Sequence, residues 1–352
     1  MRSLRTFERR FFEFARRQCR LGRGARVVAA VSGGPDSVAL LTLLARHKDA
    51  QGWKVHAAHF NHRVRGRASD RDEAFVRRLC RDLKIPLKVG RRRLPKRLSS
   101  PARTRTGSLN EERLREMRIK FLVRAARSLR ATHVAIGHQR NDVAETFLMR
   151  LLRGAGADGL AVLPPRTSRE GLLWVRPLLP FPRAEIEAWL RSQKIPWRED
   201  LTNRRVDRMR NRIRHELLPL LARRYNPRVV EELARAAEIL REENDYMESR
   251  AAHAVSEKKV SLARLRRAPL ALRRRMVRRA VAEAKGDLRR ITFAHVESIL
   301  NLLESGHEAH LPDWLTVSRN GRFLHFRSHD VSRPTSQTKR PPRRPRVRRG
   351  SR

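Results

Sequence analysis

The sequence has few cysteines and no long apolar run. Its two cysteines, Cys19 and Cys80, are too few for a disulfide framework or a zinc site, and they fit a cytoplasmic protein. Because no stretch of about 18 apolar residues occurs, we expect no transmembrane helix and no membrane partner. Glu8 and Glu13, with little serine around them, argue against a transit peptide at the basic N-terminus.

Acidic residues are also scarce. The chain has 82 Lys and Arg residues against 36 Asp and Glu residues, a formal net charge of +46. A genome that favours arginine would explain the choice of arginine over lysine, but it would not explain this excess. A polyanionic partner follows, and nucleic acid is the commonest one. The length of 352 residues suggests two or three domains, and a homodimer is compatible with a sequence that carries no signal for oligomeric state.

The stretch VVAAVSGGPDS at 27–37 predicts an anion site. The apolar run at 26–31 indicates a buried strand, and VALLTLLAR at 38–46 indicates a helix. Between them, Gly33 and Gly34 allow a sharp turn and close approach to a ligand, and Pro35 suits a first helical turn. Free N–H groups at a helix start bind phosphate. The pattern is neither a Walker loop nor a dinucleotide fingerprint, so an ordinary glycine-rich turn is the alternative for this stretch alone.

Strand-like and helix-like stretches alternate through the first part of the chain. Further strands are expected at 54–60, 87–92, 133–137 and 172–175, and helices at 69–83, 108–128 and 141–153, with a basic loop at 91–105. This alternation is typical of an α/β fold with a doubly wound parallel sheet. Ligands of such sheets bind at the carboxyl ends of the strands, which is where SGGPDS lies.

Helices dominate from about residue 211. They are expected at 211–221, 227–255, 268–284 and 293–305, and the Asn320-Gly321 pair predicts a β-hairpin at 316–326. The Pro- and Arg-rich end has hardly any large apolar residue and is expected to be disordered. We therefore expect a catalytic domain at 1–215, a mostly α-helical domain with a terminal β-hairpin at 216–327, and a basic tail at 328–352.

Three further blocks carry polar side chains. His56, His59 and His62 follow a spacing of three, but successive positions of a strand point to opposite faces, so a loop near a nucleotide is favoured over a metal site. In the block at 135–146, four polar residues fall at i, i+3, i+4 and i+7 after a strand end, which favours a site over a solvated face; they are His138, Asn141, Asp142 and Glu145. The arginine run at 208–214 suits phosphates and bases, with a solvated basic helix as the alternative.

The full SGGPDS pattern resembles the pyrophosphate loop of the N-type ATP pyrophosphatases, which cleave ATP to AMP and pyrophosphate. Over residues 20–225 the chain is similar to the tRNA(Ile)-lysidine synthetase family. The matching pieces are SGGPDS, HFNHRVRG, NEERLRE, GHQRNDVAETFLMRLLRGAGADGLAVL, RPLL and WREDLTN…RNRIRHELLPLL. The resemblance implies that ATP adenylates the wobble cytidine of a CAU-anticodon tRNA(Ile), and that the ε-amine of free L-lysine then displaces AMP.

The resemblance also implies roles for particular residues. The ATP site would comprise Ser32, Gly33, Gly34, Pro35, Asp36, Ser37 and His59, with Asp36 binding Mg²⁺. Catalytic roles would fall to Asp36, Arg113, His138, Asp142 and Glu145. The tRNA would contact Arg205, Arg208, Arg210, Asn211, Arg212 and Arg214. One departure is Asn141, where the family often has a second acidic residue beside Asp142.

Two alternatives remain at this stage. A tRNA thiolase on the same fold activates a base in the same way but usually needs a C-x-x-C pair, which Cys19 and Cys80 do not form. A non-catalytic RNA-binding protein would explain the charge but not the nucleotide-type loop.

Overall fold

The chain forms two compact units, which divide after Glu242 within a long helix. The computed structural model describes residues 2–64, 66–92, 111–199, 209–256, 258–304 and 306–328. The expected basic loop from 93 onward, the expected helix start at 108–110 and the expected tail beyond 328 lie outside these residues. No helix among the described residues has the length and apolar character needed to cross a membrane.

The first unit is built on a six-stranded sheet of order β3-β2-β1-β4-β6-β5. Neighbouring strands from β3 to β6 are parallel, and only β5 is antiparallel to its neighbour. The mostly parallel α/β sheet expected from the sequence is confirmed. The edge strand β5 was not predicted, because its residues RTSR lack apolar side chains. The strands are β1 (Arg26–Ala30), β2 (Lys54–Asn61), β3 (Leu87–Arg91), β4 (His133–Ala135), β5 (Arg166–Arg169) and β6 (Leu172–Val175).

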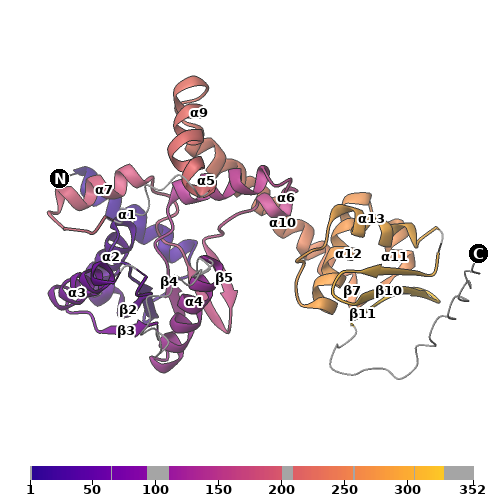
Figure 1. Cartoon of the computed structure of the whole chain (residues 1–352), viewed down its shortest axis with the longest axis horizontal. Coiled ribbons are helices and arrows are strands. Elements are labelled where there is room, and N and C mark those ends of the chain that lie inside the picture. Colours follow the sequence, from indigo (N-terminus) through magenta and orange to yellow (C-terminus); the bar gives the residue numbers. More distant parts are fainter. Residues whose placement is uncertain are drawn as a thin grey trace, which may run out of the picture. The chain divides into compact units, whose positions relative to one another are not determined.

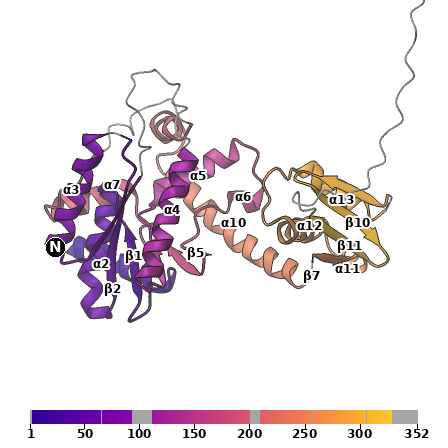
Figure 2. The ribbon, with the colours of Figure 1, turned by 60° about the horizontal axis from the view of Figure 1, so that its bottom comes forward.

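Helices cover both faces of this sheet (Figures 1 and 2). One face packs on four helices, α1 (Arg2–Arg17), α2 (Pro35–Gln51), α3 (Arg67–Asp82) and α7 (Arg183–Ser192). The other face packs on α4 (Glu111–Ser128), where Phe121 and Leu122 meet Val28 and Val134. Helix α7 was not predicted. Because β1 lies inside the sheet with helices on both faces, it reads as a continuous apolar run.

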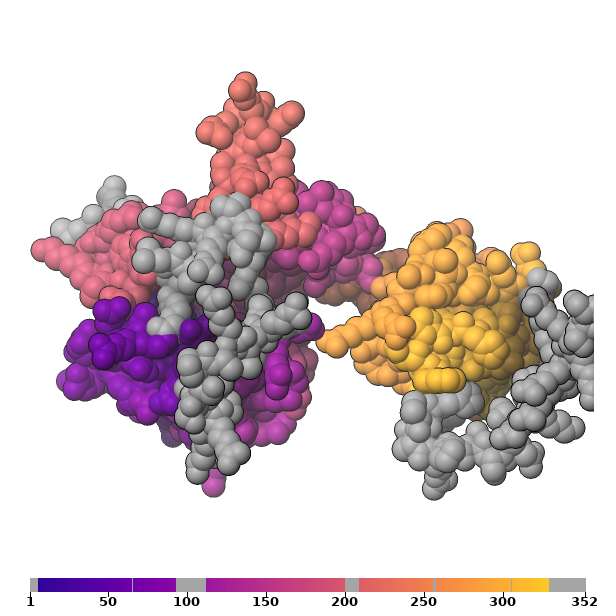
Figure 3. All heavy atoms as spheres, in the orientation of Figure 1, coloured from indigo at the N-terminus to yellow at the C-terminus, as the bar shows by residue number. Residues whose placement is uncertain are grey.

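A second layer of helices packs beside the sheet. Helix α5 (Arg140–Leu151) contacts the start of α10 (Val229–Ala252) through Phe147 and Ala237. The layer also includes α6 (Ala157–Leu160), α8 (Met209–Arg212) and the π-helical turn η2 (Ile213–Leu217), which contact α5. Helix α9 (Leu218–Arg224) follows η2 and projects from the surface in Figure 3. This packing joins residues 216–242 to the first unit, whereas the sequence placed the domain boundary at 215.

The second unit has a five-stranded antiparallel sheet of order β7-β8-β11-β10-β9. The predicted hairpin is present as β10 (Leu315–Asn320) and β11 (Phe323–Ser328). The other strands are β7 (Val255–Ser256), β8 (Lys259–Ser261) and β9 (Glu308–Leu311); they are too short to show a period in the sequence. Helices α11 (Leu262–Arg267), α12 (Leu270–Lys285) and α13 (Phe293–Asn301) complete the unit, and Val277 and Ile299 share a core with Val317.

Candidate active site

The loop after β1 is held by hydrogen bonds to Ser37. The Oγ of Ser37 accepts from the backbone N–H groups of Ser32 (3.1 Å) and Gly33 (3.2 Å) and donates to the carbonyl oxygen of Gly34 (2.9 Å). Gly33 has a φ of +96°, which residues with a Cβ seldom adopt. No side chain caps the start of α2 among the described residues. The first-turn N–H groups therefore lie at a preformed turn suited to an anion.

The carboxyl end of β4 meets this loop at Gly137. A Cβ built on Gly137 would lie 3.0 Å from the backbone C and O of Asp36 and 3.2 Å from the N of Ser37. Strands β1 and β4 are neighbours, and the chain order reverses between them, so the contact lies at the switch point of the sheet. Glycine at 137 is thus required by close backbone approach, and it brings the start of α5 next to the phosphate loop.

Gly137→Ala is expected to weaken ATP binding by roughly 10- to 100-fold, because a misplacement of about 1 Å in such a site can cost 10²-fold. The added methyl group would press on the backbone of Asp36, which cannot rotate away as a side chain would. Isothermal titration of the full chain with ATP and Mg²⁺ measures the effect. Gly22→Ala is the matched control, since nothing lies within 4 Å of a Cβ there. Equal affinities for the two variants would refute a tight contact between β4 and the loop.

Asp36 has the character of a cation ligand. Its Oδ1 is buried and has no hydrogen-bond partner among the described residues. Burial, followed by the nearby Asp142 carboxylate, raises its pKa from 3.8 to about 7, while Arg183 and Arg214 lower it. Mg²⁺ in nucleotide sites is bound by one or two carboxylates, and phosphate oxygens and water complete its coordination. The unpartnered Oδ1 of Asp36 is suited to be one such carboxylate ligand. The described residues hold no group of three or more His, Cys, Asp or Glu side chains that could hold a metal ion.

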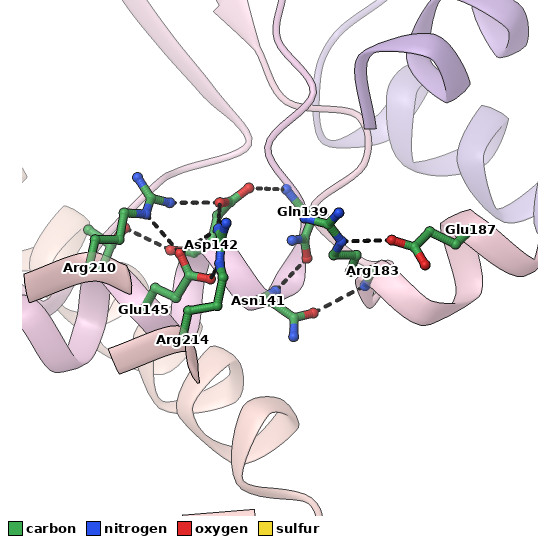
Figure 4. A network of polar contacts seen from close by, with 9 residues as sticks. Gln139, Asn141, Asp142, Glu145, Arg183, Glu187, Arg210 and Arg214 are labelled. Atoms are coloured by element: carbon green, nitrogen blue, oxygen red, sulfur yellow. Dashed lines mark hydrogen bonds and ion pairs between the residues drawn. The ribbon is translucent and has the colours of Figure 1, made fainter. Parts of the chain in front are cut away.

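The two carboxylates of α5 form an ion-pair cluster with the arginine run (Figure 4). Asp142 Oδ1 lies 2.6 Å from Arg210 Nη2, and Glu145 Oε2 lies 2.7 Å from Arg210 Nε. Arg214 binds Glu145 with two N–H groups, at 2.6 and 2.9 Å. Because Arg210 and Arg214 are four residues apart, both guanidinium groups lie on one helical face. The structure therefore brings together residues that the sequence assigned separately to the catalytic set and to tRNA binding.

The helix that carries these arginines widens at η2. The N–H of Leu218 reaches back to the carbonyl of Ile213, one residue further than in an α-helix. Pro219 has no N–H and cannot continue the regular ladder at this point. Arg212 is exposed and pairs with Glu216. Asn211 lies beside it half-buried, and Arg205 and Arg208 of the predicted tRNA-binding set lie outside the described residues.

His138 and Asn141 do not join the carboxylate cluster. Helix α5 begins at Arg140, so the helical spacing that grouped His138 with Asp142 does not apply to it. His138 Nδ1 accepts from Arg176 Nε at 3.2 Å. Burial, then Arg176 and Arg210, lowers the pKa of His138 to about 3, which keeps the ring neutral.

In Figure 4, Asn141 at the start of α5 points away from the carboxylate cluster and toward Arg183. Its Oδ1 accepts from the backbone N–H of Arg183 at the start of α7 (3.1 Å). The side chain of Arg183 in turn pairs with Glu187 at 2.8 Å. Position 141 thus joins α5 to α7, and an amide oxygen serves this contact without the charge of a carboxylate.

Arg113 is exposed on α4. The arginines of that helix whose charges act on His138 are Arg115 and Arg118. The family resemblance placed Arg113 itself near the nucleotide, and that role stays a prediction.

His59 is buried behind the phosphate loop. Its Nδ1 lies 2.8 Å from the carbonyl oxygen of Val31, the residue that precedes Ser32. Burial lowers the pKa of His59, and its Nε2 has no partner among the described residues. This histidine therefore supports the backbone that leads into the loop.

A buried carboxylate that the sequence did not single out anchors the HFNHRVRG block. Glu73 on α3 accepts from Asn61 Nδ2 (3.2 Å) and Arg91 Nη2 (2.6 Å), and Arg77 adds two further bonds. The bonds from Arg91, Asn61 and Arg77 lower the pKa of Glu73 to about 2. Glu73 is three residues after Asp70 on a helix that reads as solvated, so periodicity alone gives no sign of its burial.

The WREDLTN block also reaches the phosphate loop. The backbone N–H of Arg198 donates to the carbonyl of Gly33 at 2.9 Å, and its Nε donates to Asp72 Oδ1 at 3.2 Å. Arg198 therefore contacts the loop, and residues 200–203 of the block lie outside the described part of the chain. Spacing in the sequence linked it only to the arginine run.

Both cysteines are free and buried. Burial raises the pKa of Cys19 to about 12 and that of Cys80 to about 11. Such thiols are poor nucleophiles at neutral pH.

Known proteins share this arrangement. A PP-loop domain model matches residues 4–221, and a TilS substrate binding domain model matches residues 261–324. A tRNA(Ile)-lysidine synthase of Geobacter sulfurreducens is 40% identical over 326 residues, which cover 89% of this chain and 67% of that protein. The chain belongs to the tRNA(Ile)-lysidine synthase family. A second lysidine synthase, from Symbiobacterium thermophilum, is 39% identical over 343 residues, with 92% and 70% of the two chains covered. The family resemblance noted in the sequence is confirmed.

The lysidine synthase family shares its fold with other tRNA enzymes. The solved structure of the U34-tRNA thiolase NcsA from Methanococcus maripaludis has a TM-score of 0.51 and 19% identity, covering 66% of this chain and 79% of that one. This likeness concerns the fold alone.

Proposed function

We propose that this chain joins lysine to C2 of the wobble cytidine in a tRNA(Ile) with a CAU anticodon. The C2 carbonyl oxygen attacks the α-phosphate of ATP and releases pyrophosphate. The ε-amine of lysine then attacks C2, loses a proton and displaces AMP. The observation that carries the proposal is the 40% identity to a lysidine synthase over 89% of the chain. A PP-loop domain implies ATP as the activating nucleotide.

The phosphate loop supports the first step. The turn held by Ser37 presents the start of α2, where N–H groups and the helix dipole attract phosphate oxygens. Asp36 would hold Mg²⁺, and a bound Mg²⁺ would supply positive charge opposite the leaving pyrophosphate. Because its pKa is about 7, Asp36 gives up a proton when it takes on this role near neutral pH.

The α5 cluster supports the second step. Asp142 is eight per cent exposed and Glu145 one per cent, and the charge of Asp142 acts on Asp36 of the phosphate loop. We assign lysine recognition to Asp142, which would hold the ε-ammonium or accept its proton, and Glu145 supports it through the shared arginines. His138 is neutral and its Nδ1 accepts from Arg176, so the ring proton lies on Nε2 and offers a donor to the cytidine.

A labelled-lysine assay tests the proposal. With ATP and Mg²⁺, the purified full chain should transfer lysine to a CAU-anticodon tRNA(Ile) transcript and not to the same transcript with a GAU anticodon. AMP and pyrophosphate should form in equal amounts with the product. Absence of lysine transfer, or transfer that does not depend on the anticodon, would refute the proposal.

A cysteine-free variant distinguishes the thiolase alternative. Cys19→Ser combined with Cys80→Ser is expected to keep lysine transfer within about twofold at a temperature where the fold persists, because neither buried thiol reaches the site. Circular dichroism would verify the fold, since replacing buried thiols with hydroxyls weakens packing. Loss of turnover from a folded variant, together with sulfur transfer by the parent, would support the thiolase instead.

A further inference from the structure

The second unit exposes a large aromatic side chain in a tight turn. Trp314 lies between β9 and β10 and is 70% exposed. The core side chains of the same sheet, such as Leu315 and Val317, are buried. At 70% exposure the indole contributes little to the core of the unit and is open to a partner.

The backbone at this turn is unusual. Asp313 has a φ of +62° and Trp314 a φ of +59°, both in the left-handed region. Bulky residues seldom adopt this conformation, and where they do, surrounding contacts usually enforce it at a functional position. At the next turn along the sheet the positive φ of +55° falls on Gly321, which adopts it without strain.

An ion-pair cluster holds the turn in this conformation. Asp313 Oδ2 lies 3.0 Å from Lys285 Nζ, and Asp313 Oδ1 lies 2.8 Å from Arg290 Nη1. The Lys285 side chain is eight per cent exposed and also binds Asp287. A lysine this well covered and doubly paired is a fixed anchor. It positions Asp313, and through it the direction of the indole that follows.

The chemistry around Trp314 favours nucleic acid over an apolar protein partner. The guanidinium of Arg290, paired with Asp313, is 71% exposed beside the indole turn. The turn lies within the part of the chain that matches the substrate binding domain model. Indole rings stack on unpaired bases of any sequence, and a neighbouring guanidinium suits the adjoining phosphate. The net charge of +46 draws a polyanion to the protein.

We infer that Trp314 is a stacking platform for an unpaired base of the tRNA, with Arg290 at the backbone of the same nucleotide. This inference rests on the proposed function for the identity of the RNA. Asp313 and Lys285 are positioning residues, because they act on the base only through the orientation of the turn.

Binding measurements with four variants of the full chain test the platform. At fixed ionic strength, Trp314→Ala should raise the Kd for a CAU-anticodon tRNA(Ile) transcript about tenfold, within the range of one base stack. Trp314→Phe should stay within about threefold of the parent, because a phenyl ring still stacks. Trp314→Leu should resemble the alanine variant. Tyr246→Ala is the matched control, since it removes another exposed aromatic, 63% exposed, from a regular helix of the same unit.

Each outcome separates the explanations. Full affinity in Trp314→Leu would indicate an apolar contact and overturn base stacking, and unchanged affinity in Trp314→Ala would overturn the platform. Lysine transfer at saturating tRNA should keep its kcat in Trp314→Ala and show a raised KM for tRNA. If the parent transfers no lysine while Trp314→Ala still weakens tRNA binding, the proposed function fails and the platform stands.

Discussion

Asp36→Asn is expected to reduce lysine transfer roughly a thousandfold, since charge stabilisation by a bound metal ion is worth several kcal/mol. The same change should raise the melting temperature of the first unit at pH 8. A few degrees are expected, because about 1 kcal/mol shifts Tm by roughly 2–4 °C in a unit of this size. The same substitution would thus show that the Asp36 carboxylate is needed for lysine transfer and lowers the stability of the first unit.

The pH dependence of the stability follows from the raised pKa of Asp36. The carboxyl has a pKa of about 7 in the folded chain against 3.8 ordinarily, so between these values the folded state binds a proton that the unfolded chain has released. Stability is therefore lost as the pH rises from 3.8 to about 7. The advantage of asparagine should grow over that window and level off above it. Thermal melts of parent and variant at pH 4, 5, 6, 7 and 8 measure this.

Asp49→Asn is the matched control for Asp36→Asn. Asp49 is an exposed carboxylate in the last turn of the same helix, so its replacement should leave lysine transfer and the pH profile of Tm unchanged. A difference in Tm between Asp36→Asn and the parent that did not depend on pH would contradict the buried, proton-holding carboxyl described above. Retained lysine transfer in Asp36→Asn would exclude its assignment to Mg²⁺.

Glu145→Ala should destabilise the first unit by about 2–3 kcal/mol. Breaking a fully buried ion pair costs about 3–5 kcal/mol, and the value is discounted here because both arginines keep some contact with water. Glu145 is one per cent exposed and receives bonds from Arg210 and Arg214, which would be left with Asp142 alone. Urea unfolding followed by circular dichroism measures the loss.

Two further variants sharpen this second test. Arg212→Ala removes an exposed arginine of the same helical segment, whose pair with Glu216 is also exposed, and should change stability by less than about 0.5 kcal/mol. A double-mutant cycle of Glu145→Ala and Arg214→Ala should show a coupling energy of at least about 1 kcal/mol, as for residues in one network. Additive effects would mean that the short distances contribute little to stability.

The phosphate loop was predictable because its chemistry is local. A strand, two glycines, a proline and a helix are contiguous from Val27 to Arg46, so propensity and capping rules apply directly. The hairpin around Asn320-Gly321 was predictable for the same reason. By contrast, α7 is a helix of only ten residues, and β7, β8 and β9 have two to four residues each, too few for a clear pattern.

The predicted helical face that included His138 was wrong, because helical periodicity was applied to a residue before the helix. The spacing of i, i+4 and i+7 grouped His138 with Asp142 and Glu145, but α5 begins after His138, and a strand-end residue does not follow helical geometry. Glu73 escaped notice because a glutamate on a charged helix usually meets water. Its partners Asn61 and Arg91 come from β2 and β3, which are remote from it in the sequence.

The sequence by itself determined the family, the α/β sheet and the phosphate loop, because each depends on residues that are neighbours along the chain. Only the tertiary structure decided which charged side chains form ion pairs and which backbone segments touch. It paired Arg210 and Arg214 with Asp142 and Glu145, pressed Gly137 onto Asp36, and fixed Trp314 in its turn through Lys285. The physical reason is that burial and Coulombic coupling depend on distance in space, and residues far apart in sequence approach one another only when the strands and helices pack.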